Sequence, residues 1–160
     1  MQWVALIAIT IAALDQATKW LIVRSISPEE PRTVISGFFS LVNWRNTGAA
    51  WGIFQHYNFV LTTISVLTVL ALCLFRRSFR LGRPGPRLAL GLIIGGVIGN
   101  LIDRVRLGSV IDFLYFYVGP YHWPAFNVAD SSICIGVGLY VILTWRTDAT
   151  AERHHAAISP

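Results

Sequence analysis

Two aspartates, Asp112 and Asp130, stand at the outer end of the last apolar run of a chain that carries few charges. A carboxylate at the edge of hydrocarbon loses hydration unless it shares a proton or finds a partner, so its presence there calls for a reason. Neither residue has a cation at a helical spacing in its own segment. Two carboxylates held close together cannot both ionise, and they keep a shared proton. That state suits peptide hydrolysis, because one carboxylate takes a proton from water and the other donates one to the scissile carbonyl.

Other acidic residues compete for this role. Asp103 ends the third apolar run, and a pair of Asp103 with Asp130 fits the chain as well as the pair named above. Asp103 also adjoins Arg104, and because intramembrane charges usually pair, a structural role as an ion-pair or cap residue is favoured for it. Asp15 and Lys19 are spaced i, i+4, so they can satisfy one another on one helical face, and a structural role is favoured for Asp15 as well.

The composition is that of a membrane protein. The 160 residues are 54% hydrophobic and only 13% charged, with a mean hydropathy of +0.58, whereas soluble domains are about 25% charged. Residues 1–160 are therefore expected to form a single integral membrane domain. The net charge of +5 does not indicate nucleic-acid binding, because the positive residues gather in one short loop: Arg76, Arg77, Arg80, Arg83 and Arg87.

Four apolar runs predict four membrane spans, at about residues 3–23, 59–75, 88–102 and 126–145. The third is the short one, and its Gly95, Gly96 and Gly99 predict close packing against neighbouring helices. The arginine-rich loop places the connection between the second and third runs in the cytoplasm. Both termini are then cytoplasmic, and residues 24–58 and 103–125 lie outside.

The outer region 24–58 is β-rich. The stretches 33–35 and 38–44 flank the turn signal Ser36-Gly37, which predicts a small hairpin on the outer surface. Most of the tryptophans near this level are interpreted as an interfacial aromatic belt: Trp20, Trp44, Trp51 and Trp123. The polar tail 146–160 is expected to be unstructured.

No metal or cofactor site is indicated. Cys73 and Cys134 lie in apolar runs without a CxxC pattern and are interpreted as buried apolar side chains. No HExxH motif occurs, and no serine or cysteine is convincingly set up with a histidine base. We therefore expect a metal-free mechanism whose rate chelators leave unchanged.

Five segments taken together resemble the prolipoprotein signal peptidase family, also called signal peptidase II, bacterial enzymes that remove signal peptides from lipid-modified prolipoproteins. The segments are Asp15-Gln16-Ala17-Thr18-Lys19, Asn46-Thr47-Gly48-Ala49-Ala50-Trp51-Gly52, Gly95-Gly96-Val97-Ile98-Gly99-Asn100-Leu101-Ile102-Asp103-Arg104, Val110-Ile111-Asp112-Phe113 and Phe126-Asn127-Val128-Ala129-Asp130-Ser131. They cover nearly the whole chain in one order. The one departure is Trp51, where the family often has phenylalanine.

The resemblance implies that Asp112 and Asp130 are the catalytic dyad, which decides between the two pairs left open above. It implies that a further set of residues binds substrate or supports the dyad: Asn46, Gly48, Asn100, Arg104 and Asn127. The residues alone leave two of these open. Asn127 shares a helical face with Asp130, where its amide can donate to a carboxylate or cap the helix, and Arg104 can instead reach lipid headgroups.

The resemblance also implies an all-α membrane fold, a four-transmembrane-helix bundle with a small extracytoplasmic β-sheet platform. The expected location is the bacterial cytoplasmic (inner) membrane, with the active site near its outer face. The expected substrate is a prolipoprotein with a lipobox and a diacylglyceryl-cysteine, which enters from the membrane lipid and is cut on the amino side of that cysteine. The enzyme is expected to act as a monomer without a cofactor.

Two other classes of protein fit the charges alone. A proton-coupled carrier places its essential acid near the midplane, whereas the acids here are expected on one side. A non-catalytic scaffold would not need Asp112 or Asp130.

Overall fold

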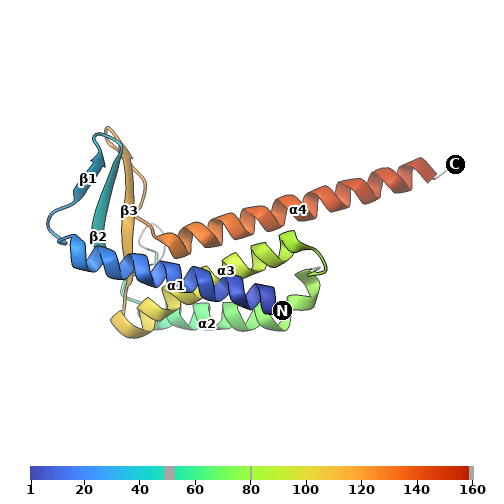
Figure 1. Ribbon diagram of the computed structural model, residues 1–160, viewed down its shortest axis with the longest axis horizontal. Coiled ribbons are helices and arrows are strands. Elements are labelled where there is room, and N and C mark those ends of the chain that lie inside the picture. The colour runs from blue at the N-terminus through green and yellow to red at the C-terminus, as the bar shows by residue number, and fades with distance from the viewer. Residues whose placement is uncertain (49–52, 80, 159–160) are drawn as a thin grey trace.

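The computed structural model describes residues 1–48, 53–79 and 81–158, and from residue 146 onward the backbone only. Ala49 to Gly52, which include Trp51 of the second quoted segment, lie outside the described residues, as does Arg80. Along the chain the elements are α1 (Gln2–Ser25), β1 (Arg32–Ile35), β2 (Phe39–Asn46), α2 (Asn58–Leu74), the 3-10 helix η2 (Arg76–Phe79), α3 (Pro84–Leu107), β3 (Val110–Val118), β4 (Tyr121–His122) and α4 (Val128–Ile158). Figure 1 shows the α-helices running alongside one another, with the sheet standing across one end of the bundle.

Three helices of the described chain are long and apolar enough to cross a membrane: α1, α3 and the first part of α4, Val128–Trp145. The remaining apolar helix, α2, has 17 residues. The third predicted span, 88–102, lies within α3, which has 24 residues. Pro84 stands in its first turn, where a missing N–H costs nothing, and Gly108 ends it in the left-handed conformation with φ 71°.

The tail also differs from the prediction of an unstructured segment. The α4 backbone continues as helix to Ile158. The residues beyond Trp145 include several alanines together with Glu152 and Arg153, which have high helix propensity, and no glycine or proline interrupts them before Ile158. The polar composition of residues 146–160 was therefore not a sufficient signal for the end of α4.

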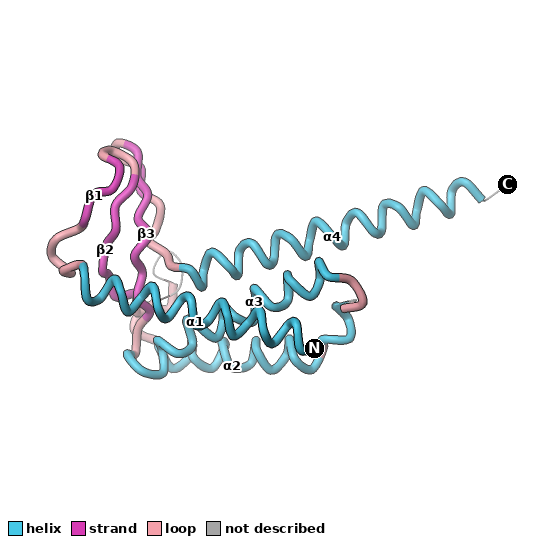
Figure 2. The backbone as a smooth tube through the Cα atoms, viewed as in Figure 1, coloured by secondary structure: helices cyan, strands magenta, loops and turns pink. Residues whose placement is uncertain are grey.

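The predicted hairpin is present, and it belongs to a larger antiparallel sheet with the strand order β1-β2-β3-β4 (Figure 2). Gly37 turns the chain between β1 and β2 with φ 73°, and Thr33 lies opposite Ser40. Strands β3 and β4 come from the second outer connection, 103–125, for which no strand was predicted. Because Asp112 lies opposite Trp44 in the register of β2 and β3, the sheet holds this aspartate in place.

Helix α3 packs against α1 and α4 through small residues, as the glycine pattern predicted. A Cβ atom on Gly95 would lie 2.7 Å from the Ala8 oxygen of α1, and one on Gly96 would collide with the Ala129 oxygen of α4. These contacts leave no room for a side chain at either position. Backbones that approach this closely set α1 and α4 at fixed positions beside α3.

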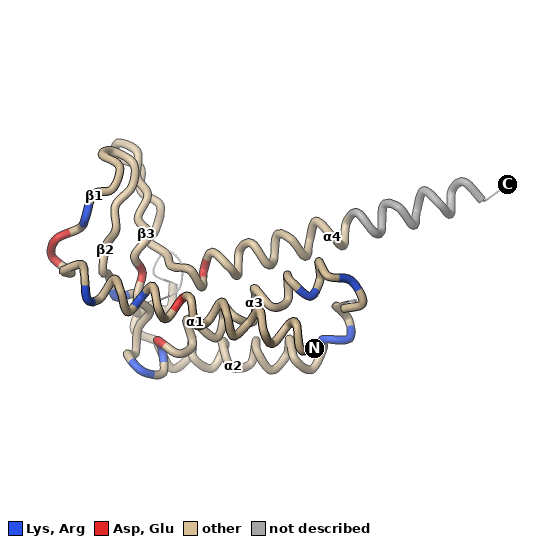
Figure 3. The backbone as a smooth tube through the Cα atoms, in the orientation of Figure 1, with Lys and Arg blue, Asp and Glu red and all other residues tan. Residues whose placement is uncertain are grey.

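Among the residues coloured in Figure 3, the acidic ones lie toward the sheet end, whereas basic ones lie at both ends of the bundle. Arginines of the connection between α2 and α3 lie at the end that also holds the N-terminus, and the sheet lies at the opposite end. The buried acidic residues of the helices lie toward the sheet end. The sheet end is therefore where polar chemistry is concentrated.

Candidate active site

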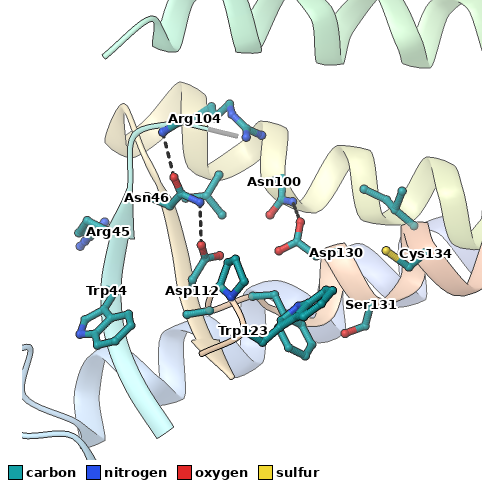
Figure 4. Close-up of a pocket in the computed structure, with 16 residues that line it drawn as sticks. Trp44, Arg45, Asn46, Asn100, Arg104, Asp112, Trp123, Asp130, Ser131 and Cys134 are labelled. Atoms are coloured by element: carbon teal, nitrogen blue, oxygen red, sulfur yellow. Dashed lines mark hydrogen bonds between the residues drawn. The ribbon is translucent and has the colours of Figure 1, made fainter. Parts of the chain in front are cut away.

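A cavity of about 660 Å³ opens where the sheet meets α3 and α4 (Figure 4). Its walls are mainly apolar and aromatic, and a few polar groups converge on it, which is the usual character of a ligand site. Asp112 of β3 and Asp130 of α4 both line it. The other polar residues that line it are Arg45, Asn46, Asn100, Arg104 and Ser131.

Asp112 is buried, and both of its oxygens accept hydrogen bonds from neutral amides. Asn46 of β2 donates its Nδ2 proton to Oδ2 at 2.9 Å, and Asn127 donates its Nδ2 proton to Oδ1 at 2.8 Å. The backbone N–H of Gly48 donates to Asn46 Oδ1 at 2.9 Å, which orients the Asn46 amide with its NH2 group toward Asp112. Neither amide supplies a full positive charge to the carboxylate.

Asp130 stands in the first turn of α4, where Asn127 and Asp130 form a capping box. The Asp130 backbone N–H donates to Asn127 Oδ1 at 2.9 Å, and the Asn127 backbone N–H donates to Asp130 Oδ2 at 3.2 Å. Asn100 of α3 donates to Asp130 Oδ1 at 2.7 Å (Figure 4). Both sequence interpretations of Asn127 hold, because it caps α4 and its side-chain amide donates to a carboxylate.

The side chain of Asn127 thus links the two aspartates. It is fully buried, it donates to Asp112, and its own oxygen accepts the Asp130 backbone N–H. The aspartates also act on each other through space. Burial, and then the nearby Asp130 carboxylate, raise the pKa of Asp112 to about 7, against the opposing effects of Asn46, Asn127 and Lys19.

A second group of acids lies behind the cavity and does not line it. We call Asp15, Lys19 and Asp103 the Lys19 cluster; these residues are 0%, 1% and 2% exposed. Lys19 Nζ lies 2.9 Å from Asp15 Oδ2 and 2.8 Å from Asp103 Oδ2. The predicted pair of Asp15 with Lys19 is present, but the ion-pair partner of Asp103 is Lys19 and not the adjacent Arg104.

This arrangement bears on the choice between Asp112 and Asp103 as the partner of Asp130, which the residues alone left open. Asp103 is held by Lys19, by Gln16 at 2.9 Å and by the Ile111 backbone N–H at 3.2 Å. Asp112 and Asp130 instead face the cavity, where a peptide could reach them. The geometry therefore favours Asp112 with Asp130 as the pair that can act on a substrate.

Comparisons with known proteins show the family of this chain. The family described as Signal peptidase (SPase) II matches residues 7–146. The chain belongs to the signal peptidase II family. It is 49% identical over 145 residues to the lipoprotein signal peptidase of Syntrophotalea carbinolica, which covers 88% of this chain and 89% of that protein. It is 42% identical to the lipoprotein signal peptidase of Bacillus pumilus over 86% of this chain and 88% of that protein.

A solved structure is similar as well. It is described as a bacterial membrane enzyme determined by the in meso method at 2.3 Å resolution, with a TM-score of 0.83 and 33% sequence identity. The match covers 94% of this chain and 92% of that chain. The resemblance seen in the sequence is thereby confirmed, and this signal peptidase II family member is a membrane-embedded protease.

Several residues of the cavity wall were not predicted to be there. Trp44 and Trp123, interpreted as part of an aromatic belt, line the cavity, and the Trp44 ring lies 4.8 Å from that of Tyr115. Cys134 was expected to be buried, but it is exposed and lines the cavity one helical turn beyond Asp130. The i, i+4 spacing from Asp130 was the signal that could have placed it on this face.

Arg104 lines the cavity and lies close enough to Asp130, Asp112 and Asp103 to interact with their charges. Its backbone oxygen accepts a hydrogen bond from Asn58 of α2 at 3.1 Å, which ties the shorter helix to the site. Among the described residues, no group of three or more His, Cys, Asp or Glu side chains could hold a metal ion. The metal-free mechanism stays a prediction.

Proposed function

We propose that this protein is an aspartic endopeptidase of the bacterial inner membrane that removes signal peptides from diacylglyceryl-modified prolipoproteins, with Asp112 and Asp130 as its catalytic dyad. Relatives named lipoprotein signal peptidase, similar over nearly their whole length, support the substrate class. One observation supports the dyad above all: Asn127 bonds both aspartates, and both line one cavity. A diacylglyceryl-cysteine and a signal helix are both lipid-soluble, so the substrate enters sideways from the bilayer.

The raised pKa of Asp112 supports a dyad that carries one proton near neutral pH. In the proposed reaction the ionised aspartate takes a proton from a water molecule, and the water oxygen bonds to the scissile carbonyl carbon. The protonated aspartate gives its proton to the carbonyl oxygen. The C–N bond of the resulting tetrahedral intermediate then breaks, and the leaving amine, the new N-terminus of the cysteine, receives the proton that came from water. A hydroxyl of the intermediate returns its proton to the other aspartate, which leaves a carboxylic acid product and restores the singly protonated dyad.

The neighbouring residues have distinct proposed tasks. Asn46, held by Gly48, and Asn127 fix the Asp112 carboxylate, and Asn100 fixes the Asp130 carboxylate. None of these amides carries a charge, so the shared proton can move between the two acids. Arg104, the cation of α3 on the cavity wall, attracts the negative charge that develops on the carbonyl oxygen.

The membrane arrangement is part of the proposal. Residues 1–160 form one domain that acts as a monomer. Helix α2 counts as the fourth span, because its 17 residues at about 1.5 Å each cover about 25 Å of the roughly 30 Å hydrocarbon core. The arginines between α2 and α3 support a cytoplasmic location for that end and for both termini. The cavity then lies near the outer face. A carrier, which needs its acids near the midplane, is disfavoured by their concentration toward the sheet end.

The test is turnover of a diacylglyceryl-modified prolipoprotein by purified protein in detergent. Asp112→Asn and Asp130→Asn keep the shape of the side chain but cannot exchange the proton, so each is expected to lower kcat by about 1,000-fold or more. Glu30→Gln, a substitution at an exposed acidic residue of the outer region, is the matched control and is expected to leave turnover unchanged. Substantial turnover by either dyad variant in correctly folded protein would refute the assignment.

A further inference from the structure

The Lys19 cluster is a buried charged group that the proposed reaction does not use. None of its three members lines the cavity, so none can touch the substrate there. Burying charges is costly, and a buried ion pair is often no more stabilising than well-packed apolar side chains. Its presence at the junction of α1 and α3 therefore calls for a role besides stability.

Each carboxylate of the cluster holds the backbone immediately before one aspartate of the dyad. Asp15 Oδ1 accepts the backbone N–H of Ala129 at 2.9 Å, and Ala129 precedes Asp130. Asp103 Oδ2 accepts the backbone N–H of Ile111 at 3.2 Å, and Ile111 precedes Asp112. The two elements that carry the dyad, α4 and β3, are thus attached to one cluster by the same kind of bond.

Lys19 connects these two attachments. Its ammonium has three N–H donors, and the structure gives each a partner: Asp15 Oδ2, Asp103 Oδ2, and Asn100 Oδ1 at 2.9 Å. Asn100 in turn donates to Asp130 at 2.7 Å. A single ammonium therefore ties together both backbone attachments and one direct contact to the dyad.

We propose that Asp15, Lys19 and Asp103 are positioning residues that set the separation and orientation of the Asp112 and Asp130 side chains. The inference rests on the proposed function, because it assigns those two aspartates as the reacting pair. Positioning matters in such a reaction, since a displacement of about 1 Å in a reacting group can cost about 100-fold in rate. The cluster acts on the reaction through the backbones of β3 and α4 and through Asn100, without contact with the substrate.

Lys19 also supplies a charge that faces the dyad. The titratable and charged groups that the structure places around the two aspartates are Asp15 and Lys19 from α1, Asp103 and Arg104 from α3, Arg45 from β2 and Cys134 from α4. Among them, Lys19 lowers the pKa of Asp112. Removing this cation should raise the pKa of Asp112 further, a consequence that a purely structural side chain would not have.

The central test is Lys19→Met, which keeps an unbranched stem and removes the ammonium, in the full-length protein with a lipidated precursor. We expect kcat to fall by about 100-fold while KM changes by less than about threefold, because the cluster does not touch the substrate. The alkaline limb of the pH–rate profile should move to higher pH. Leu90→Ala is the matched control, because it removes a buried side chain of α3 that packs against Val4 and Ala8 of α1, the two helices that the cluster also joins. It should lower the melting temperature and leave kcat and the alkaline limb unchanged.

A milder variant serves if Lys19→Met does not fold. Gln16→Leu removes the 2.9 Å bond to Asp103 Oδ1 and keeps all three charges of the cluster. It should lower kcat severalfold, with KM unchanged. Wild-type kcat in both variants, or a raised KM with an unchanged kcat, would overturn the positioning role. The proposed function fails separately, if Asp112→Asn or Asp130→Asn retains turnover, so the two failures are distinguishable.

Discussion

Two pairs of aspartates lie near one another toward the sheet end of this protein, and their partners differ. Asp15 and Asp103 share the ammonium of Lys19 at 2.9 and 2.8 Å. Asp112 and Asp130 are held by the neutral amides of asparagines and line the cavity. A cation stabilises the ionised carboxylate, whereas amides leave the carboxylate able to keep a proton. The choice between lysine and asparagine as a partner thus separates the acids of the Lys19 cluster from the acids proposed to react.

The comparison predicts opposite effects of the same isosteric change on stability. Asp103→Asn leaves Lys19 short of a buried partner, and breaking a buried ion pair costs about 3–5 kcal/mol. With about 2–4 °C per kcal/mol for a chain of this length, the melting temperature should fall by about 10 °C. The fall can be measured by thermal unfolding in detergent.

Asp112→Asn should behave differently, and only at high pH. The pKa of Asp112 is raised from 3.8 to about 7 in the folded protein. Its contribution to stability is therefore fully present below pH 4 and is lost as the pH rises through 7. Removing the titratable group should raise the melting temperature at pH 8 by several degrees and leave it unchanged at pH 4. Equal changes of melting temperature in Asp103→Asn and Asp112→Asn would contradict the distinction between the acids that bond to Lys19 and those that bond to asparagines.

Asn127 joins the two regions, and its removal should weaken catalysis more than stability. Asn127→Ala loses the bonds to Asp112 and Asn100 and the cap of α4. Loss of an N-cap costs about 1 kcal/mol, whereas misplacing both acids should lower kcat by about 100-fold. Asn43→Ala is the matched control, since Asn43 is a buried asparagine that donates to the Ile26 oxygen away from the cavity. Similar kcat values for the two alanine variants would refute the special place of Asn127.

The pH dependence of turnover tests whether the dyad needs its proton. Above its raised pKa of about 7, Asp112 loses the proton that it would donate. The value of kcat/KM should therefore fall about tenfold per pH unit above neutral pH. A flat profile up to pH 9 would show that no acid of the dyad has to be protonated.

Much of the fold followed from the sequence, because hydrophobic runs and β-rich stretches are local signals. The helices lie close to the predicted runs, and β1 and β2 form the predicted hairpin. Strand β3 was missed although Val110 to Val118 is rich in branched and aromatic residues, a strand signal in itself. The run was interpreted only as a connection that carries Asp112, since its partner strand lies more than 60 residues earlier in the chain.

The candidate site divides in the same way. The i, i+4 pair of Asp15 with Lys19 could be predicted, because both residues stand on one helix. The bond from Lys19 to Asp103 could not, because it joins α1 to α3 across a contact that has no local signature. Without that bond, Asp103 remained a rival of Asp112 until the family resemblance decided between them. Long-range partners, more than residue type, determine which acid reacts.

The smallest expected effect concerns which side of the membrane the reactive pair faces. In protein freed of Cys73 and Cys134, His122→Cys places a thiol on exposed β4 of the sheet, and Arg83→Cys places one just before α3, at the arginine-rich end. Because the positive-inside bias puts that end in the cytoplasm, an impermeant maleimide added to intact cells should label residue 122 and not residue 83. Permeabilised cells should show labelling of both. The reverse pattern would place the cavity on the cytoplasmic side, where both acid pairs would face the wrong compartment for exported lipoproteins.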